Sequence, residues 1–579
     1  MRRSWSLAGA VLALVLLATG CVGMPDSGPV NESDTSADSS EPEASSIDAI
    51  PPRPQAPPAD IAKGFIDAMS AWPIQIGVAK QFLSEEAAGA WNPNAATITF
   101  EGAFPKEVTS RVATIELSQP ERLDASGAWE GELPEADREL RFELVLEDGE
   151  YRITNPPDAL IVRADWFAQR FVQMSLYFFD RTGRILVPEP VFVPRGDQLA
   201  STLVNRLLKP EESLQRISRS YLPTVDAGLS VPISSQGVAS VDFGGTNAGP
   251  QDPDDDDLAR MLAQVGWTLR QVPGIRAIRV SIGGEDVPVT GDGEYSVTEG
   301  EQYDPASSGA DPLLYGLRGG RLVYGEPESL DPAPGPLGEP GNHGLRSISV
   351  NLHGSTSVGV SSDGTSLVSA PVRDHSGVTP TTLVRNKSSL LPPAWDFTDR
   401  LWVVDNTPNG ARVAYRERGP LVPVQVPGVS GRDVKAFLIS RDGTRFAAVV
   451  HKRAGDQVRA GRILFDDQGQ VTGAGQTRQI LVDGVDRANI TDIAWISPTS
   501  VMVVRPISDV TSEVSTVPVD GAPTDSTSIS VSGRAYDLAV APDDSSQPYA
   551  VTRDGLYDLE TSAIVPFFGG RVSSLGYVG

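Results

Sequence analysis

Cys21 is the only thiol in the 579-residue chain, and its position limits the chemistry it can perform. Arg2 and Arg3 precede an apolar run from Leu7 to Ala18, and two small residues stand directly before the cysteine. This order of charge, apolar run and small residues is that of a secretory signal. The run is shorter than the roughly 20 apolar residues of a membrane span, so it predicts a cleaved leader. A lone cysteine in an exported protein has no intramolecular disulfide partner, which leaves the thiol for another use.

Thr19-Gly20-Cys21 resembles the bacterial lipobox, in which the cysteine sulfur takes a diacylglycerol and the leader is cut before that cysteine. Ala18 stands where leucine is more usual, a replacement that the motif tolerates. The resemblance implies lipidation at Cys21, and the alternative is an ordinary signal peptide with a chance cysteine near its cleavage site. An anchor of two or three acyl chains would hold firmly, because each buried methylene contributes about 0.8 kcal/mol.

The residues needed for an enzyme are sparse. The first two domains contain no histidine, so they have no histidine-based acid or base chemistry. The chain has no phosphate-binding GxxxxGK[ST] sequence and no GxSxG elbow. We therefore predict no catalytic residue, no cofactor site and no metal site, although a glycosidase-like carboxylate pair stays open because sequence spacing does not reveal one. The four histidines, none of which pairs with another at metal-ligand spacing, are His343, His353, His375 and His451.

Two groups of carboxylates are candidate sites. Asp67 and Glu116 are pocket candidates in the first domain, but no histidine accompanies them, and we interpret them as surface or capping charges. The densest charge run, Asp252 with Asp254 to Asp257, lacks the alternating ligands and central glycine of an EF-hand loop, which makes a calcium site the weaker interpretation. We expect an acidic loop that enters a helix at Leu258, where negative charge meets the positive helix end.

Composition excludes one class of partner. The net charge is −27 and no cluster of lysine and arginine occurs, so a general nucleic-acid binder is not expected. The length favours about three or four domains. No later run of 18 or more apolar residues follows the leader, which predicts that the chain has no second membrane span.

The first 156 residues divide into a leader (1–20), a lipidated disordered tether (21–59) and an α+β domain (60–156). The tether is rich in Pro, Ser, Asp and Glu and cannot bury enough apolar surface to fold. In the domain, Ile61, Phe65, Met69 and Trp72 recur at helical spacing, a second helix is expected over 78–90, and alternating strand patterns follow. Helices first and a curved sheet after resemble the NTF2-like fold.

The segment 157–290 alternates strand, helix, strand, helix and strand, which predicts an α/β domain. Three stretches of it resemble the GerMN domain of bacterial envelope and sporulation proteins, an interaction module with no known catalytic residues. A Pro- and Gly-rich linker is expected at 291–311. The stretches that resemble GerMN are 203–208, 238–242 and 273–275.

From 312 to 579, short strands alternate with turns at a spacing of about 35 to 55 residues, which is a β-propeller period. Asp-Gly pairs are expected to form hairpin turns inside the blades. We predict five or six blades, with Leu313 to Tyr324 supplying the closing strand, and a β-sandwich is the alternative. The repeated turn segments are 361–365, 395–400, 440–444, 495–499 and 541–544.

The order of leader, lipobox, tether, α+β domain, GerMN-like domain and propeller resembles the actinobacterial lipoprotein LpqB family over essentially the whole chain. The resemblance implies a lipid-anchored protein on the extracytoplasmic face of the cell membrane. It also implies binding to the extracellular sensor region of the MtrB histidine kinase and modulation of two-component signalling in cell-wall homeostasis and division. The alternative functions are binding of cell-wall polysaccharide or peptidoglycan, and its hydrolysis.

Overall fold

The structure is a computed structural model. Cys21, the predicted leader and most of the predicted tether lie outside the residues it describes. Among the described residues, no helix is both long and apolar enough to cross a membrane. The described residues are 47–579 without the segments 226–227, 245–253, 290–292, 307–308, 374–376, 483–488 and 524–527.

The first domain begins with helices, as its apolar spacing predicts. Ile61 and Phe65, one turn apart on the first helix, have no exposed surface and pack into the domain core. The helices are α2 (Pro58–Ala68), α3 (Gly77–Lys80) and α4 (Glu85–Ala90).

The single helix expected over 78–90 is wrong, because α3 and α4 are separate. Ser84 caps α4 by accepting a hydrogen bond from the Ala87 N–H at 3.2 Å. The backbone N–H of Ser84 donates to the carbonyl oxygen of Ile153 at 2.9 Å. A residue that caps one helix and bonds to a strand has left helical geometry, so the helix is interrupted at Ser84.

Two four-stranded sheets complete this domain, with strand orders β5-β4-β1-β8 and β2-β3-β6-β7. The domain is α+β as predicted, with its helices before its sheets. β8 (Leu160–Arg163) joins the first sheet by parallel pairing with β1, and α5 (Ala164–Arg170) follows it. The other strands are β1 (Thr97–Phe100), β2 (Gly102–Val108), β3 (Val112–Ser118), β4 (Glu121–Leu123), β5 (Trp129–Glu132), β6 (Glu139–Glu147) and β7 (Glu150–Ile153).

The GerMN-like domain alternates strands and helices as predicted. A long hairpin of β9 and β10 pairs with β11, and a separate sheet is built on the parallel pair β12 and β13. β15 (Tyr295–Ser296), which falls in the predicted linker, pairs with β13. The remaining elements are β9 (Phe171–Asp180), β10 (Leu186–Pro194), α6 (Leu199–Leu207), β11 (Ser218–Arg219), β12 (Val238–Asp242), α7 (Asp255–Leu269), β13 (Ala277–Ile282) and β14 (Glu285–Asp286).

The acidic run caps α7. Asp254 accepts a hydrogen bond from the Asp257 N–H at 2.8 Å, and the first turn is acidic, so negative charge lies at the positive helix end. The helix begins at Asp255, three residues before the expected Leu258. Asp252 lies outside the described residues.

The carboxyl-terminal domain is a β-propeller. In the described residues it has six sheets, five of four strands and one, the fourth, of five strands because β31 is added to it. The innermost strands contact one another in the cyclic order β40, β19, β23, β27, β32, β36 and back to β40, which defines a ring. Six is one of the two blade numbers that the spacing predicts.

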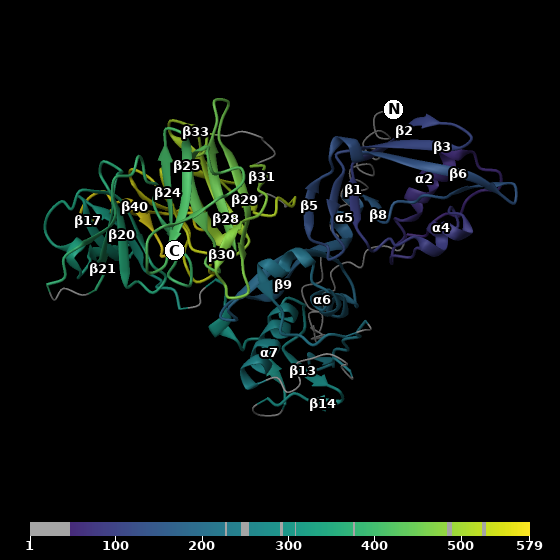
Figure 1. Cartoon of the computed structure of the whole chain (residues 1–579), viewed down its shortest axis with the longest axis horizontal. Helices are drawn as coiled ribbons and strands as arrows, with labels where there is room; N and C mark the ends of the chain where they lie inside the picture. The colour runs from purple at the N-terminus through teal and green to yellow at the C-terminus, as the bar shows by residue number, and fades with distance from the viewer. Residues whose placement is uncertain are drawn as a thin grey trace, which may run out of the picture. The chain divides into compact units, whose positions relative to one another are not determined.

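The first blade contains strands from both ends of the domain. β16 and β17, within the expected closing segment, pair with each other, and β40 completes their sheet by pairing with β16. In Figure 1, β40 carries the yellow of the C-terminal end yet is labelled beside β17 and β20. The strands of this blade are β16 (Leu314–Arg318), β17 (Arg321–Glu326), β18 (Ser329–Pro332) and β40 (Ser573–Gly576).

The other five blades follow in sequence order. Blade two has β19 (Leu345–Val350), β20 (Thr356–Ser361), β21 (Leu367–Pro371) and β22 (Thr381–Val384). Blade three has β23 (Ala394–Trp395), β24 (Leu401–Thr407), β25 (Gly410–Arg416) and β26 (Val422–Val424). Blade four has β27 (Asp433–Ile439), β28 (Arg445–His451), β29 (Gln457–Phe465), β30 (Val471–Ala474) and β31 (Arg478–Ile480). Blade five has β32 (Asp492–Ser497), β33 (Ser500–Ser508), β34 (Thr511–Pro518) and β35 (Ser528–Ser532), and blade six has β36 (Asp537–Ala539), β37 (Tyr549–Val551), β38 (Gly555–Asp558) and β39 (Ile564–Pro566).

One of the predicted repeats is out of register with the others. The segments 395–400, 440–444, 495–499 and 541–544 each join the first and second strands of a blade. Residues 361–365 instead join the second and third strands of blade two. The equivalent turn of that blade is 351–355, which contains His353. An Asp-Gly turn fits any tight hairpin, so the pair alone does not fix its place in a blade.

Candidate functional site at the junction of two domains

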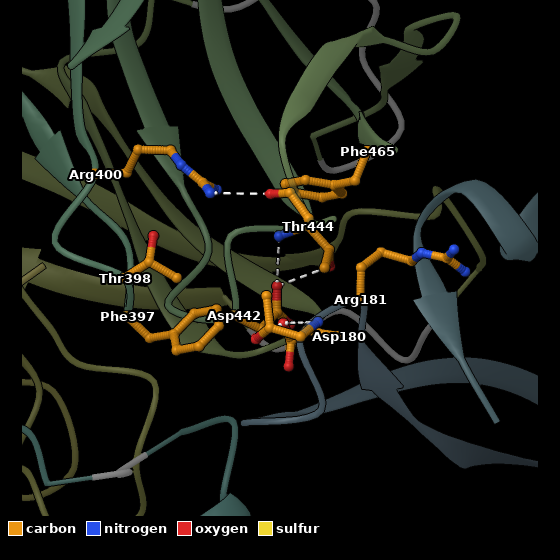
Figure 2. Close-up of a pocket in the computed structure, with 10 residues that line it drawn as sticks. Asp180, Arg181, Phe397, Thr398, Arg400, Asp442, Thr444 and Phe465 are labelled. Atoms are coloured by element: carbon orange, nitrogen blue, oxygen red, sulfur yellow. Dashed lines mark hydrogen bonds between the residues drawn. The ribbon is translucent and has the colours of Figure 1, made fainter. Parts of the chain in front are cut away.

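The turn between β9 and β10 lies against two turns of the propeller and encloses a small cavity. Its volume is about 10 Å³, close to the space of a single water molecule. Figure 2 shows Asp180 of the GerMN-like domain beside Asp442 of the propeller. The lining residues are Asp180, Arg181, Thr182, Phe397, Thr398, Arg400, Asp442, Thr444, Phe465 and Gly469.

Asp180 shapes the GerMN-like side of the junction. Its carboxylate accepts backbone hydrogen bonds from Thr182 at 2.8 Å, Arg184 at 2.7 Å and Ile185 at 3.0 Å. An aspartate that bonds the backbone two residues ahead imposes a turn. Asp180 therefore holds the end of the β9–β10 hairpin, and its oxygens are occupied.

Two propeller turns repeat this arrangement. Asp442 accepts from the Thr444 N–H at 2.8 Å and the Thr444 hydroxyl at 2.7 Å. Asp396 accepts from the Thr398 N–H at 2.9 Å and from the indole N–H of Trp402 at 3.2 Å. Both carboxylates are buried, and burial raises the pKa of Asp396. These aspartates organise loops and expose no free oxygen for a substrate.

Arg445 carries the main ionic contact across the junction. Its guanidinium, with 2% of the side chain exposed, lies 3.2 Å from Glu189 Oε2 of β10 and 3.5 Å from Asp442 Oδ2. It also donates to the carbonyl oxygen of Pro188. Glu189 pairs with Arg462 as well, so one carboxylate serves two guanidinium groups.

Burial, together with the positive charge of Arg462, lowers the pKa of Arg445 to about 10, against the opposing effect of Glu189. The guanidinium remains charged at neutral pH. A buried charge of this kind must stay paired, because the loss of one partner leaves the other desolvated. The contact therefore fixes the position of β10 relative to blade four.

The same part of the propeller also meets the first domain. Arg478 donates to the carbonyl oxygen of Trp129 in β5 at 2.7 Å and to the carbonyl oxygen of Asp520. The Gln173 side chain at the start of β9 donates to the Asp520 carboxylate at 3.2 Å. Blades four and five thus contact both preceding domains.

The sequence-derived site residues do not converge. Asp67 pairs with Lys63 on the surface, and Glu116 is exposed. His353 is exposed, and His343 Nε2 lies 3.2 Å from the backbone carbonyl oxygen of Glu339. His451 Nδ1 lies 2.7 Å from Asp456 Oδ1. His375 and the lipidation candidate Cys21 lie outside the described residues. In the described part of the chain, no group of three or more His, Cys, Asp or Glu residues is placed to hold a metal ion.

Sequence reasoning missed Glu189 and Arg445 as partners, and nothing in their spacing connects them. It also missed a signal that was present. Asp-x-Thr occurs in both propeller turns at this junction and in the β9–β10 turn, and in all three the aspartate bonds the threonine N–H.

The fold defines a class of protein that combines an α+β domain, a GerMN-like domain and a propeller. Family models match the same three parts of the chain. They are the lipoprotein LpqB N-terminal domain over 51–168, the sporulation and spore germination domain over 175–288 and the lipoprotein LpqB beta-propeller domain over 320–563.

Relatives match along the whole length. A lipoprotein LpqB of Streptomyces avermitilis is 26% identical and covers 97% of this chain and 96% of its own. One of Streptomyces coelicolor is 27% identical over 89% of this chain and 88% of its own. The solved first GerMN domain of the sporulation protein GerM from Bacillus subtilis is 21% identical, with a TM-score of 0.17, over 22% of this chain and 95% of that one. The chain belongs to the lipoprotein LpqB family.

Proposed function

We propose that this protein is a lipoprotein anchored through Cys21 on the extracytoplasmic face of the cell membrane. There it binds the extracellular sensor region of an MtrB-like histidine kinase and modulates two-component signalling in cell-wall homeostasis and division. The observation that carries the proposal is the match to lipoprotein LpqB over almost the whole chain, together with the leader and lipobox-like sequence.

The junction supports a binding role. Its carboxylates are occupied by backbone N–H groups and guanidinium groups, and the cavity has room for about one water molecule. A modulator needs a surface of fixed shape, and contacts among the domains provide one. A lipid anchor confines the protein to the plane of the kinase, which raises the effective concentration of a weak partner.

The test is reconstitution of the lipidated protein with the full-length sensor kinase in lipid vesicles. Binding and phosphotransfer are followed together, because a modulator must bind the two sensor states with different affinity. We expect saturable binding that changes kinase phosphorylation at least twofold. No binding to a kinase that is shown to be active contradicts the proposal. It then favours a role in binding or hydrolysing cell-wall polysaccharide.

A further inference from the structure

The propeller has a face that lies opposite the junction, which we call the open face. It is the end of the ring where the inner strands begin, at residues such as Asp492 and Asp537. β32 pairs with β33 only as far as Asp492, which lies opposite Val504. The β33–β34 hairpin continues to Ser508, opposite Thr511, so its tip projects past the start of the inner strand.

Apolar side chains are exposed at the tips of this face. Ile507 is 55% exposed and Val510 is 72% exposed, both at the end of the β33–β34 hairpin. Phe568, after β39, is 63% exposed. They are the three most exposed large apolar side chains in the described part of the propeller. Single exposed apolar residues are ordinary, but a group on one face marks an interaction surface.

Contacts between neighbouring hairpin tips join them into one surface. The Gly533 N–H donates to the Val510 carbonyl at 2.8 Å. A Cβ at Gly533 would lie 3.8 Å from the Thr552 side chain, at the tip of the next blade. That tip is continuous with the end of β39, because Gly555 pairs with Pro566, two residues before Phe568.

Arginines stand among the apolar tips. Arg534, Arg553 and Arg571 are exposed, and the Arg571 guanidinium lies 4.4 Å from the centroid of the Tyr536 ring. Asp509 and Asp554 are exposed on the same tips. The arginines exceed the aspartates here, although the chain as a whole is strongly acidic.

We propose that Ile507, Val510 and Phe568, with the three arginines, dock the propeller onto the anionic surface of the lipid bilayer. Apolar side chains on projecting tips enter the boundary between headgroups and acyl chains. Neighbouring arginines bind the negatively charged phosphate groups of the lipid. The apolar residues stand on tips rather than in a groove, a shape that suits a deformable lipid surface.

The inference rests on the proposed anchor, which brings this face to the membrane. The covalent chain from Cys21 to Ile47 spans at most roughly 90 Å, which sets an upper limit on the distance between the bilayer and Ile47. Docking of the open face would hold the propeller at the surface, so that the protein has two contacts with the membrane instead of one.

The test uses the full lipidated chain in vesicles of phosphatidylglycerol. Because Cys21 is the only cysteine, Ser508→Cys gives a single free thiol for a fluorescent label once Cys21 is acylated. The control is Glu328→Cys, an exposed residue in the turn at the opposite end of β17. We expect brominated lipid to quench the label at 508 at least twofold more strongly than the label at 328. Equal quenching at both positions overturns the proposal.

Two further arms assign the residues. I507S/V510S/F568S in the S508C chain should reduce the quenching to the level of the control, and unchanged quenching excludes these residues as the contact. In phosphatidylcholine vesicles, quenching of the label at 508 in the S508C chain should be at least twofold weaker than in phosphatidylglycerol vesicles. Equal quenching in the two lipids overturns the role of the arginines. Co-sedimentation of the same samples with vesicles measures binding through the lipid anchor. Loss of the anchor is therefore distinguished from loss of docking by the open face.

Discussion

Asp492 and Asp537 occupy the same position in adjacent blades, the first residue of an inner strand, and each bonds to the blade that follows. Asp492 accepts a hydrogen bond from the Leu538 N–H at 2.8 Å, and Asp537 accepts one from the Ser574 N–H at 3.2 Å. Other polar side chains bridge blades in the same way. Asn406 accepts from Val434 N–H, Asp456 from Ile490 N–H and Ser574 Oγ from Ile348 N–H.

The two aspartates make propeller stability depend on pH. Burial, with the charge of Asp537, raises the pKa of Asp492 to about 7, and burial raises that of Asp537 to about 6. A folded-state pKa above the unfolded value of about 4 means that the folded state binds protons more tightly. The unfolding free energy from this pair therefore falls as pH rises from about 4 to about 7.

Asp492→Asn keeps an oxygen acceptor and removes the buried charge. We expect the variant and the parent to have similar stability near pH 4, and the variant to be more stable at pH 8 by on the order of 2 kcal/mol. Thermal unfolding across this range checks it. The matched control is Asp433→Asn at the exposed first residue of β27, which should show no such difference. An equal gain in stability at pH 8 in both variants would argue against burial of the Asp492 carboxylate as the cause of the pH dependence.

Arg445→Met should destabilise the junction by about 3 kcal/mol, because it leaves Glu189 and Asp442 with one buried partner fewer. Arg462→Met should cost about 1 kcal/mol, since the Arg462 side chain is 23% exposed. Chemical denaturation measures both. The double variant E189Q/R445M should recover part of the loss, and no recovery would show that packing and not charge sets the cost.

Gly410→Ala tests a crowded turn in blade three. Gly410 has φ +95°, and a Cβ there would overlap the Gly431 backbone. Gly131 has φ +97° with no atom within 4 Å of its notional Cβ. Gly131→Ala should cost about 1 kcal/mol from backbone strain alone, and Gly410→Ala at least twice as much. Thermal unfolding of the two variants measures the difference. Equal losses of stability would show that the overlap with the Gly431 backbone does not contribute.

Cys21→Ser removes the proposed site of lipidation. We expect the mature protein to move from the membrane fraction to the soluble fraction, because a hydroxyl in place of the thiol gives the diacylglycerol no attachment. Fractionation of cells followed by immunodetection checks this. Cys21→Ala should behave identically. Retention of either variant in the membrane fraction, when it also carries I507S/V510S/F568S to remove propeller docking, would contradict the lipid anchor.

Much of the fold followed from local patterns. Ile61 and Phe65 predicted α2 by their spacing, and the turn period from 395 onward predicted the propeller. The break at Ser84 did not follow, because it depends on a hydrogen bond to Ile153, about 70 residues away. Position within a blade was equally hidden at 361–365, since every tight hairpin accepts the same turn residues.

The charged junction was hidden for a related reason. Arg445 and Glu189 are 256 residues apart, and each resembles an ordinary surface charge in its own strand. Their pairing depends on the packing of two domains. The Asp-x-Thr turns were the local part of the junction, and they were readable from the sequence.

In the export that we propose for this protein, the pairing of β40 with β16 also sets the order in which the propeller is completed. A chain that crosses the membrane amino end first delivers the first two domains and five complete blades before the strand that finishes the first blade. Until Ser573 to Gly576 emerge, the edge of β16 has no partner and the ring stays open. Among the strands of the ring, the one delivered last would thus be the one that ends the exposure of this edge to other chains.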